Sequence, residues 1–407
     1  MPNPGEHPRW VVILGAGLAG LTVASELEKY LTAHPDAMHV VLVDHRHSLL
    51  FSTANQFALT RRAQPQQVTN PYTDLKFTNV FFIQDEVISI NTDRRLVYSR
   101  GHRFRYDVLV VAMEAEFDFE KVANLNKAAY NISSMESVLQ LRDALADFGG
   151  GNILVTAGTA LRSNPTACYE YALLLKTLVK TRMEEKVNEI TKVILAVPEE
   201  PSYSAWQLSA FEDIIRDRDI QFLPGHKPMF VDYTRRGVIF SNGEKVKYDI
   251  LVADLPTRPA QALIESKLAT EKQGIPSHPF TCRTDLPNVY CIGDCAEMFL
   301  PPPESLDVPK AGPFFVSQGK AVAQDILQLL ATNPPPPWRP DEGLGQREAV
   351  AVYAEVGSSE AIEIVANIFN NAKDIFEFSD PGKDNMKRLI GWWDDLVTEW
   401  FLVKDAP

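Results

Sequence analysis

The sequence predicts an α/β fold, and three observations support this prediction. A buried apolar strand at 11–14 leads directly into a glycine-rich turn and a helix. A second strand–helix–strand pattern starts at residue 152. Two further apolar strands, at 107–112 and 249–253, each follow a short meander. Since strands that alternate with helices are typical of parallel sheets, we expect two sheets of this kind.

The turn after the first strand has the spacing of a dinucleotide-binding loop. Gly15, Gly17 and Gly20 form GxGxxG. In this motif the first glycine permits a tight turn, the second lets a diphosphate approach the backbone, and the third lets the helix pack on the strand. The strand at 40–43 ends in Asp44, a carboxylate suited to bind a ribose hydroxyl. Together these features predict a Rossmann-like nucleotide site, with the helix N-terminus directed at the phosphates.

A distant segment distinguishes FAD from NAD, because both cofactors share the glycine motif. Residues 288–296 read NVYCIGDCA, a buried strand that ends in Gly293 and Asp294. The glycine would allow close approach of a flavin, and the carboxylate would accept hydrogen bonds from the ribityl chain. Further on, the segment PKAGP, which contains Lys310 and Gly312, opens a helix whose N-terminal amides could stabilise a reduced flavin. We therefore predict FAD as the cofactor.

The second strand–helix pattern carries a damaged form of the glycine loop. Its three glycine positions are occupied by Thr156, Gly158 and Leu161. Thr156 has a Cβ where the tight turn requires none, and Leu161 would hold the helix away from the strand. We therefore predict a second dinucleotide-type domain that does not bind NAD(P)H.

The order of these segments predicts two interleaved domains and a C-terminal helical appendage. The FAD-binding domain comprises residues 1–115 and 256–330, and the degenerate second domain is inserted at 116–255. The proline run at 334–337 is expected to form a stiff extended spacer. Residues 338–407 then form a region that contacts a membrane or a partner.

Composition and charge exclude several classes of function. The chain has 407 residues, with 53 Asp and Glu against 40 Lys and Arg, which gives a formal charge of −13. No nucleic-acid partner is expected, because such binding requires a basic face. The 8 histidines lack the spacing of metal ligands, so no metal site is predicted. The 4 cysteines do not suggest a disulfide framework, and no apolar run is long enough to span a bilayer, so we expect a cytoplasmic location.

Beyond these motifs, the chain resembles the disulfide-reductase-like flavoproteins, in particular the branch of sulfide:quinone oxidoreductase and flavocytochrome c sulfide dehydrogenase. The segments that carry the resemblance are GAGLAG at 15–20, YDVLVVA at 106–112, CYEYA at 168–172, NVYCIGDCA at 288–296, PKAGPFF at 309–315 and YAEVG at 353–357. The resemblance implies a flavin that takes two electrons from a donor on one face and passes them to a quinone on the other.

The chain departs from that branch at both redox cysteines. The matching positions hold Asn164 and Val352, and neither side chain can act as a thiolate. The segment after Asp44 contains Ser52 and no cysteine, so we expect FAD to be bound non-covalently. Residues 113–115 read MEA where the branch usually has a glycine.

Three residues are candidates for catalysis, each with a structural alternative. Cys168 begins a predicted helix, and a helix N-terminus lowers the pKa of a thiol, although a buried cysteine is more often a small hydrophobe. Glu170 could relay protons to a quinone or serve as a capping or ion-paired acid. Lys310 could steady the anionic reduced flavin or be solvated. Cys291 and Cys295 are weaker redox candidates near the flavin.

The end of the chain predicts an amphipathic helix over 386–403. The apolar residues on one face are Leu389, Ile390, Trp393, Leu396, Val397, Trp400 and Val403. Such a face can lie in a lipid interface, or pack on a second subunit or on the body of the protein. Acidic residues on the opposite face, such as Asp394, are unfavourable on anionic lipid. We expect a membrane or partner surface here, and hence a peripheral location on the cytoplasmic face of the membrane.

The sequence thus predicts a FAD-dependent oxidoreductase of the sulfide:quinone type, with an unidentified donor and a quinone as acceptor. Two alternatives stay open. One is a catalytically silent flavoprotein that acts as a binding or assembly subunit, which the loss of both cysteines favours. The other is an NADH:quinone oxidoreductase, which the damaged second loop argues against. A homo-oligomer is also open.

Overall fold

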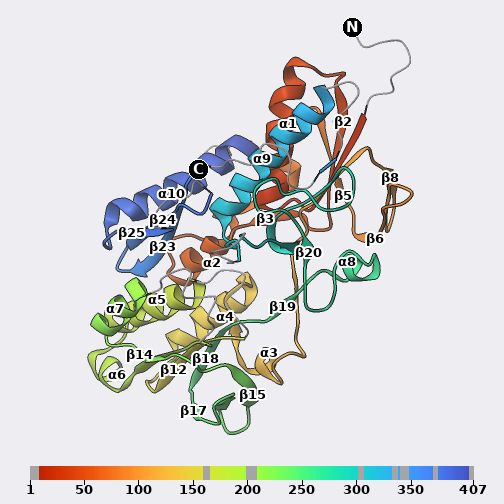
Figure 1. The fold of residues 1–407 in the computed structure, drawn as a ribbon. Coiled ribbons are helices and arrows are strands. Elements are labelled where there is room, and N and C mark those ends of the chain that lie inside the picture. Colours follow the sequence, from red (N-terminus) through yellow and green to blue (C-terminus); the bar gives the residue numbers. More distant parts are fainter. Residues whose placement is uncertain are drawn as a thin grey trace.

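A computed structural model describes residues 9–158, 166–198, 209–300, 307–331, 338–339, 348–369 and 375–402. Helices and parallel strands alternate through most of these residues, which confirms the predicted α/β class with two dinucleotide-type units. Figure 1 shows the two α/β units stacked along the long axis of the molecule, with the C-terminal strands and helix beside them.

The first unit is built on a five-stranded parallel sheet in the order β21-β9-β1-β2-β5. Its strands are β1 (Arg9–Leu14), β2 (Met38–Asp44), β5 (Val80–Gln84), β9 (Val108–Val111) and β21 (Val289–Cys291). All four residues of β9 are buried, as expected for a parallel sheet that is covered on both faces. The chain therefore leaves this sheet after β9 and returns to it with β21.

Helices α1 (Leu18–Ala33) and α9 (Gly312–Ala331) lie side by side against this sheet (Figure 1). Their close approach depends on Gly319. A Cβ added there would lie 2.8 Å from the carbonyl oxygen of Ala19 and 2.7 Å from the side chain of Thr22. Any larger residue would push the helices apart, and the N-terminus of α9 is held near that of α1 by this contact.

The second unit repeats the plan with the strand order β11-β18-β12-β13-β14. Its strands are β11 (Tyr130–Asn131), β12 (Asn152–Ala157), β13 (Lys192–Ala196), β14 (Gln221–Leu223) and β18 (Ile250–Asp254). Its helices are α4 (Met135–Ala146), α5 (Ala167–Arg182), α6 (Glu185–Ile190) and α7 (Ser209–Asp217). Four apolar residues of β12, 153–155 and 157, are buried, which matches the sequence pattern of a central strand.

Short antiparallel elements complete both units. One meander is β6 (Val87–Asn91), β7 (Leu96–Ser99) and β8 (Arg103–Arg105), and the other is β15 (Pro228–Asp232), β16 (Gly237–Phe240) and β17 (Lys245–Lys247). Further elements are β3 (Ser48–Leu50), α2 (Ser52–Leu59), β4 (Thr69–Pro71), α3 (Leu125–Ala128), α8 (Gln261–Glu265), β20 (Ile275–Pro276) and β22 (Ala296–Glu297). The two chain crossings between the units pair with each other as β10 (Glu116–Phe117) and β19 (Thr257–Arg258).

The C-terminal region contains the predicted helix, α10 (Lys383–Trp400), but also a three-stranded antiparallel sheet that the sequence reasoning did not predict. This sheet consists of β23 (Val350–Gly357), β24 (Glu360–Ala366) and β25 (Phe376–Phe378). Strand β23 packs against α5 of the second unit and α9 of the first, and α10 covers β24. The sheet therefore ties the two units together. The predicted proline spacer at 334–337 lies outside the described residues.

Most of the apolar face of α10 packs against the rest of the chain, although Ile390 on this face is 39% exposed. Contact of the helix with a membrane or a partner therefore stays a prediction. Leu389, Trp393 and Leu396 are each no more than 8% exposed, and Trp400 is 0% exposed. The ring of Trp393 lies 3.8 Å from the ring of Phe51, centroid to centroid. The face turns inward because β24 and the first unit offer it an apolar surface. Val403 lies outside the described residues.

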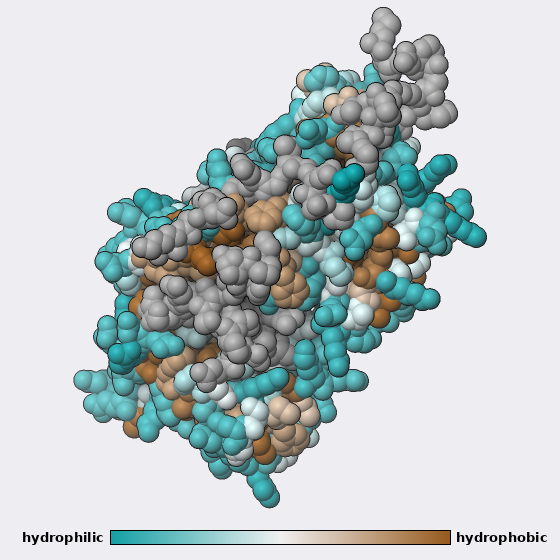
Figure 2. Space-filling view, viewed as in Figure 1, coloured by the Kyte–Doolittle hydropathy of each residue, from teal (hydrophilic) through white to brown (hydrophobic). Residues whose placement is uncertain are grey.

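No helix in the described part of the chain is long and apolar enough to cross a bilayer. Among the coloured residues on the face drawn in Figure 2, hydrophilic side chains predominate, and hydrophobic ones form smaller groups between them.

Candidate functional site

The three glycines of the first loop have the three geometries that the sequence predicts. Gly15 has a φ of +102°, and a Cβ there would lie 2.2 Å from the carbonyl oxygen of Ala112. A Cβ at Gly20 would lie 1.8 Å from the carbonyl oxygen of Gly15. At Gly17, by contrast, the nearest group in the described part of the chain would be Arg46, at 3.9 Å. The first and third glycines therefore serve packing, and the middle one faces open space.

Asp44 ends β2 beside this loop. Its carboxylate accepts hydrogen bonds from the backbone N–H of Ala16 at 2.7 Å and of Arg46 at 2.8 Å. Burial alone would raise the pKa of Asp44, but the hydrogen bonds and charge of Arg46 outweigh that effect and lower it. Asp44 is therefore an anchored carboxylate at the strand end where a ribose hydroxyl is expected.

Two cavities meet at this edge of the first sheet. The first, of about 380 Å³, is lined by five of the predicted cofactor residues, Gly17, Gly293, Asp294, Lys310 and Gly312. The second, of about 500 Å³, is lined by Gly15 and Asp44. Gly20 lies behind the loop, where it packs on Gly15. The structure thus distributes the predicted residues along one groove that has two compartments.

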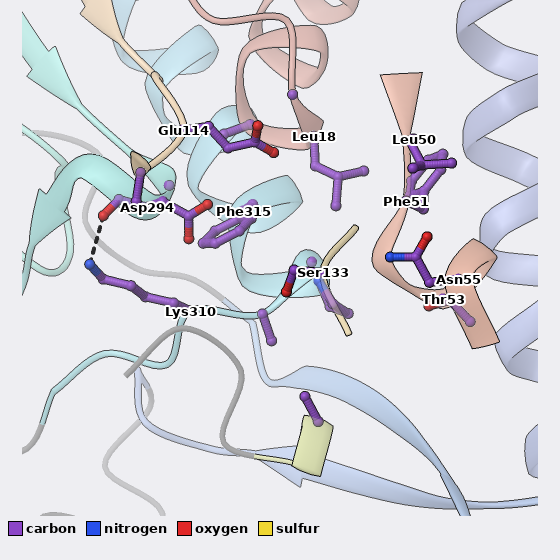
Figure 3. Close-up of a pocket in the computed structure, with 18 of the residues that line it drawn as sticks. Leu18, Leu50, Phe51, Thr53, Asn55, Glu114, Ser133, Asp294, Lys310 and Phe315 are labelled. Carbon is purple, nitrogen blue, oxygen red and sulfur yellow. Dashed lines mark hydrogen bonds between the residues drawn. The ribbon is translucent and has the colours of Figure 1, made fainter. Parts of the chain in front are cut away.

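Asp294 and Lys310 form one side of the first cavity, and Figure 3 shows Phe51 and Asn55 on the other side. The ammonium group of Lys310 donates a hydrogen bond to the backbone carbonyl of Asp294 at 2.7 Å. Burial raises the pKa of the Asp294 carboxyl to about 6, although the charge of Lys310 opposes this. Gly293 has a φ of +76°, a backbone conformation that favours glycine.

Glu170 lies in the first turn of α5 and lines the same cavity. Its carboxyl accepts hydrogen bonds from the hydroxyl of Thr166 at 2.6 Å, from Nε2 of Gln56 at 2.9 Å and from the backbone N–H of Glu355 at 3.2 Å. Burial raises the pKa of Glu170 to about 7 despite these bonds, and the charge of Glu355 adds to the rise. Glu170 can therefore exchange a proton near neutral pH.

The structure corrects the prediction for Cys168. This thiol is 0% exposed and lines neither the first nor the second cavity. Burial raises its pKa well above the ordinary value. The expected lowering by the helix N-terminus does not occur, because the cost of desolvating a thiolate in the core is the larger effect.

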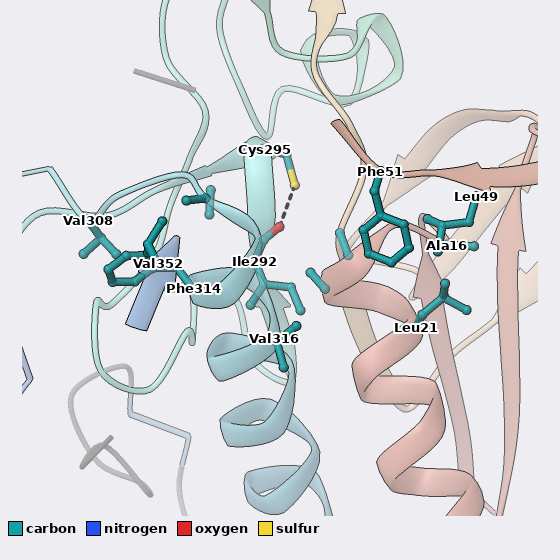
Figure 4. Packing of buried hydrophobic residues seen from close by; sticks show 14 of the residues in the cluster. Ala16, Leu21, Leu49, Phe51, Ile292, Cys295, Val308, Phe314, Val316 and Val352 are labelled. Atoms are coloured by element: carbon teal, nitrogen blue, oxygen red, sulfur yellow. Dashed lines mark hydrogen bonds between the residues drawn. The ribbon is translucent and has the colours of Figure 1, made fainter. Parts of the chain in front are cut away.

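Cys291 and Cys295 are also buried, with their sulfur atoms 3.5 Å apart. The thiol of Cys295 donates to the backbone carbonyl of Ile292 at 3.3 Å, within a cluster of buried apolar side chains (Figure 4). Burial raises the pKa of Cys291 well above its ordinary value. Both thiols therefore have the surroundings of packed core residues.

Val352, one of the two positions that would hold a redox cysteine in the resembled branch, lines the first cavity. None of the described residues that line this cavity is a cysteine. The other position, Asn164, lies outside the described residues. The remaining walls are largely apolar and come from Leu18, Leu49, Leu50, Phe51, Phe315, Leu389 and Trp392.

Two polar residues of α2 that the sequence reasoning missed also line the cavity, Asn55 and Gln56. The amide nitrogen of Asn55 donates to the carbonyl oxygen of Ile132 at 3.0 Å, and that of Gln56 donates to Glu170. These acceptors fix how both amides are turned. The oxygens Oδ1 of Asn55 and Oε1 of Gln56 are buried and have no partner among the described residues. An unmet buried acceptor indicates room for a ligand that donates hydrogen bonds.

The second glycine loop differs sharply from the first. A Cβ at Gly158 would lie 2.5 Å from the ring of Pro256, and the Gly158 N–H donates to the carbonyl oxygen of Asp254 at 2.7 Å. The chain's own backbone therefore covers this position, whereas Gly17 is open. Thr156 is 0% exposed. Leu161 lies outside the described residues.

In the described part of the chain, no three His, Cys, Asp or Glu residues are arranged to hold a metal ion.

The fold and this groove define a class of α/β proteins in which a glycine loop, an acidic strand end and two helix N-termini converge on a dinucleotide-sized site. Residues 9–313 match the family model for pyridine nucleotide-disulphide oxidoreductases. Because the match covers most of the chain, the protein belongs to this oxidoreductase family. The assignment supports the predicted flavin cofactor, and it does not select the narrower sulfide:quinone branch.

Three similar proteins illustrate the matches. The type II NADH:quinone oxidoreductase of Staphylococcus aureus is 23% identical over 338 residues, which cover 79% of this chain and 82% of that protein. The sulfide:quinone oxidoreductase of Aquifex aeolicus has a similar structure, with a TM-score of 0.80 at 17% identity, over 96% of this chain and 92% of that one. For NDH2 from Plasmodium falciparum the TM-score is 0.69 at 11% identity, over 95% and 94%. At these identities the structural matches establish the fold alone.

Proposed function

We propose that this protein is a FAD-dependent oxidoreductase that passes two electrons from an unidentified donor to a quinone. The observation that carries the proposal is the first cavity. There the open glycine loop, an apolar chamber and a buried protonatable carboxyl, Glu170, meet in one place.

The residues along the groove support FAD as the cofactor. The open space at Gly17 and the N-terminus of α1 suit the diphosphate, and Asp44 suits a ribose hydroxyl. We expect Asp294 and Lys310, which line the first cavity, to contact the ribityl chain and the flavin ring. When bound, FAD supplies reversible two-electron chemistry. We expect it to be held non-covalently, because the segment after Asp44 offers no cysteine for attachment.

A quinone as acceptor is supported by the chamber and by the relatives. Leu50, Phe51 and Leu389 supply apolar walls for a ring. The names of the Staphylococcus aureus and Aquifex aeolicus relatives both state that a quinone is their substrate. Reduction of a quinone to its hydroquinone consumes two protons, and Glu170 can donate one of them at its carboxyl oxygen. Its raised pKa lets this residue be protonated before the reaction and reloaded afterwards at neutral pH.

Sulfide is not the donor that we propose. The route through a persulfide requires a thiol beside the flavin, and the cavity has Val352 in place of one of the two cysteines. Cys168 is buried and lies outside this cavity's lining, so it does not offer a substitute.

A second candidate function is NADH:quinone oxidoreduction. The type II NADH:quinone oxidoreductase among the relatives favours it. The second loop argues against it, because Pro256 covers Gly158 where a nucleotide diphosphate would need to approach the backbone. A catalytically silent flavoprotein that serves as a binding or assembly subunit is the third candidate.

An anaerobic titration of the purified protein separates these candidates. We expect one FAD per chain, released by acid or heat, and flavin bleaching by a quinol but not by NADH or sulfide. Fast bleaching by NADH would establish the second candidate instead. A protein that contains flavin but fails to react with any quinone or quinol would support the silent subunit. Absence of flavin after gentle purification would overturn the proposal.

A further inference from the structure

The boundary between the two cavities contains an ion pair that the sequence did not predict. Among the described residues, Arg46, Met113, Glu114 and Ala115 line both cavities. Nη1 of Arg46 lies 2.7 Å from a carboxylate oxygen of Glu114. A dinucleotide that occupies both cavities must therefore pass this pair.

The sheet order shows what the ion pair spans. Arg46 follows β2 and Glu114 follows β9, and β1 lies between these two strands. Since neighbouring strands are about 4.8 Å apart, the two residues reach toward each other from strands about 10 Å apart. Between them β1 ends and the glycine loop begins. The pair thus crosses over the place where the diphosphate of a dinucleotide is expected.

The charges at this crossing do not suit an anion as they stand. The guanidinium group of Arg46 also contacts Asp44, with Nη2 at 2.9 Å and Nε at 3.1 Å from its carboxylate oxygens. One cation is therefore shared between two carboxylates. Nη2 of Arg46 also lies 3.9 Å from where a Cβ of Gly17 would be, so the guanidinium group borders the open space of the loop.

The two carboxylates differ in how easily they can be displaced. The side chain of Asp44 is 4% exposed and is also held by the backbone N–H of Ala16, whereas that of Glu114 is 57% exposed. Figure 3 shows Glu114 near Leu18, the first residue of α1. Glu114 can turn into solvent at little cost, because an exposed ion pair contributes little to stability. Asp44 keeps Arg46 in place.

We propose that Arg46 binds the diphosphate of the cofactor and that Glu114 is a displaceable latch, which occupies the same guanidinium group until the diphosphate replaces it. This inference rests on the proposed function only in that the dinucleotide is FAD. No residue of the latch takes part in electron or proton transfer. Its effect is on the affinity of the ligand-free protein for the cofactor.

The test compares FAD affinities of ligand-free proteins, measured by the change in flavin fluorescence on titration. Glu114→Gln should bind FAD about two- to fivefold more tightly than the wild type, because it removes the competing anion. Glu184→Gln is the matched control: Glu184 is an exposed acid that pairs with Lys186 but lines neither cavity, so this variant should leave the affinity for FAD unchanged. Arg46→Gln should weaken binding about tenfold or more, since it removes a charged hydrogen-bond donor.

The double variant Arg46→Gln with Glu114→Gln gives the decisive comparison. If Glu114 acts through Arg46, Glu114→Gln should no longer tighten binding in the Arg46→Gln background. Equal or weaker binding by the single variant Glu114→Gln, which changes an exposed side chain and should fold normally, would refute the latch. If the wild type itself bound no FAD, the proposed function would fail instead, and the two failures are thus distinguishable.

Discussion

Replacing Glu170 with Gln should make the protein more stable and less active. The amide has nearly the shape of the carboxyl and can keep its partners, because its oxygen can accept from Gln56 and its nitrogen can donate to the hydroxyl of Thr166. What changes is the charge. Glu170 carries a buried negative charge above its pKa, and the variant carries none at any pH.

The size of the stability effect follows from the pKa of Glu170. Burial raises this pKa from the ordinary 4.5 to about 7, a difference that corresponds to about 3 kcal/mol. Below about pH 4.5 the carboxyl is protonated in both the folded and the unfolded chain, so its titration contributes nothing. Between about pH 4.5 and 7 the folded chain binds the proton more tightly, so the free energy of unfolding falls as the pH rises. Above about pH 7 the full loss is present.

The assay is urea unfolding of the wild type and the variant at several pH values from 4.5 to 8.5. We expect the variant to gain about 3 kcal/mol over the wild type between the two ends of this range. Glu189→Gln, which changes an exposed acid on α6, is the control and should show no such gain. Quinone reduction by Glu170→Gln should fall by about 100-fold or more if the carboxyl is the proton donor. Parallel stability curves for the wild type and Glu170→Gln would refute the raised pKa on which this reasoning depends.

Further predictions concern the loop, the thiol and the C-terminal helix. Gly17→Ala should weaken FAD binding but leave the melting temperature of the ligand-free protein unchanged. Gly20→Ala should lower the melting temperature, because a Cβ at Gly20 collides with backbone whereas a Cβ at Gly17 does not. Cys168→Ser should change sulfide:quinone turnover little, and robust sulfide oxidation that disappears in this variant would contradict our view of the donor. Trp400→Ala should lower the free energy of unfolding by about 3–5 kcal/mol, measured with urea, because this side chain is 0% exposed. A much smaller loss would show that α10 is not part of the core.

The sequence predicted those parts of the fold whose geometry is determined by residues within one short segment. At Gly15 and Gly20 an added Cβ would collide with nearby backbone, so the turn requires glycine at both positions. The spacing of these glycines therefore predicts the turn. The buried strands of both sheets are continuous apolar runs, which parallel packing requires. The sheet β23–β25 was not predicted, although buried and less buried residues alternate in parts of β23 and β24.

The parts that the sequence did not predict depend on contacts between distant segments. The residues around Asn55 do not indicate that it lines a cavity. Likewise, the residues around Arg46 do not indicate that it pairs with Glu114, 68 positions away. The pKa of Cys168 was predicted from its place at a helix N-terminus, but the burial that decides it comes from other elements. The face of α10 was correctly recognised as apolar, and only the tertiary structure shows that the chain itself covers most of it.

The position of β21 has a consequence for the order in which this chain can mature. The strand that carries Gly293 and Asp294 into the first unit is synthesised after the whole inserted second unit. While the ribosome is still translating residues 116–255, the first sheet has an unpaired edge at β9, and the cofactor groove has only one of its walls. The inserted unit can fold while it emerges, since its own strands are contiguous in that stretch. We therefore expect cofactor capture to be among the last events of synthesis, and the open edge of β9 to be the point at which an interrupted chain is most prone to aggregate.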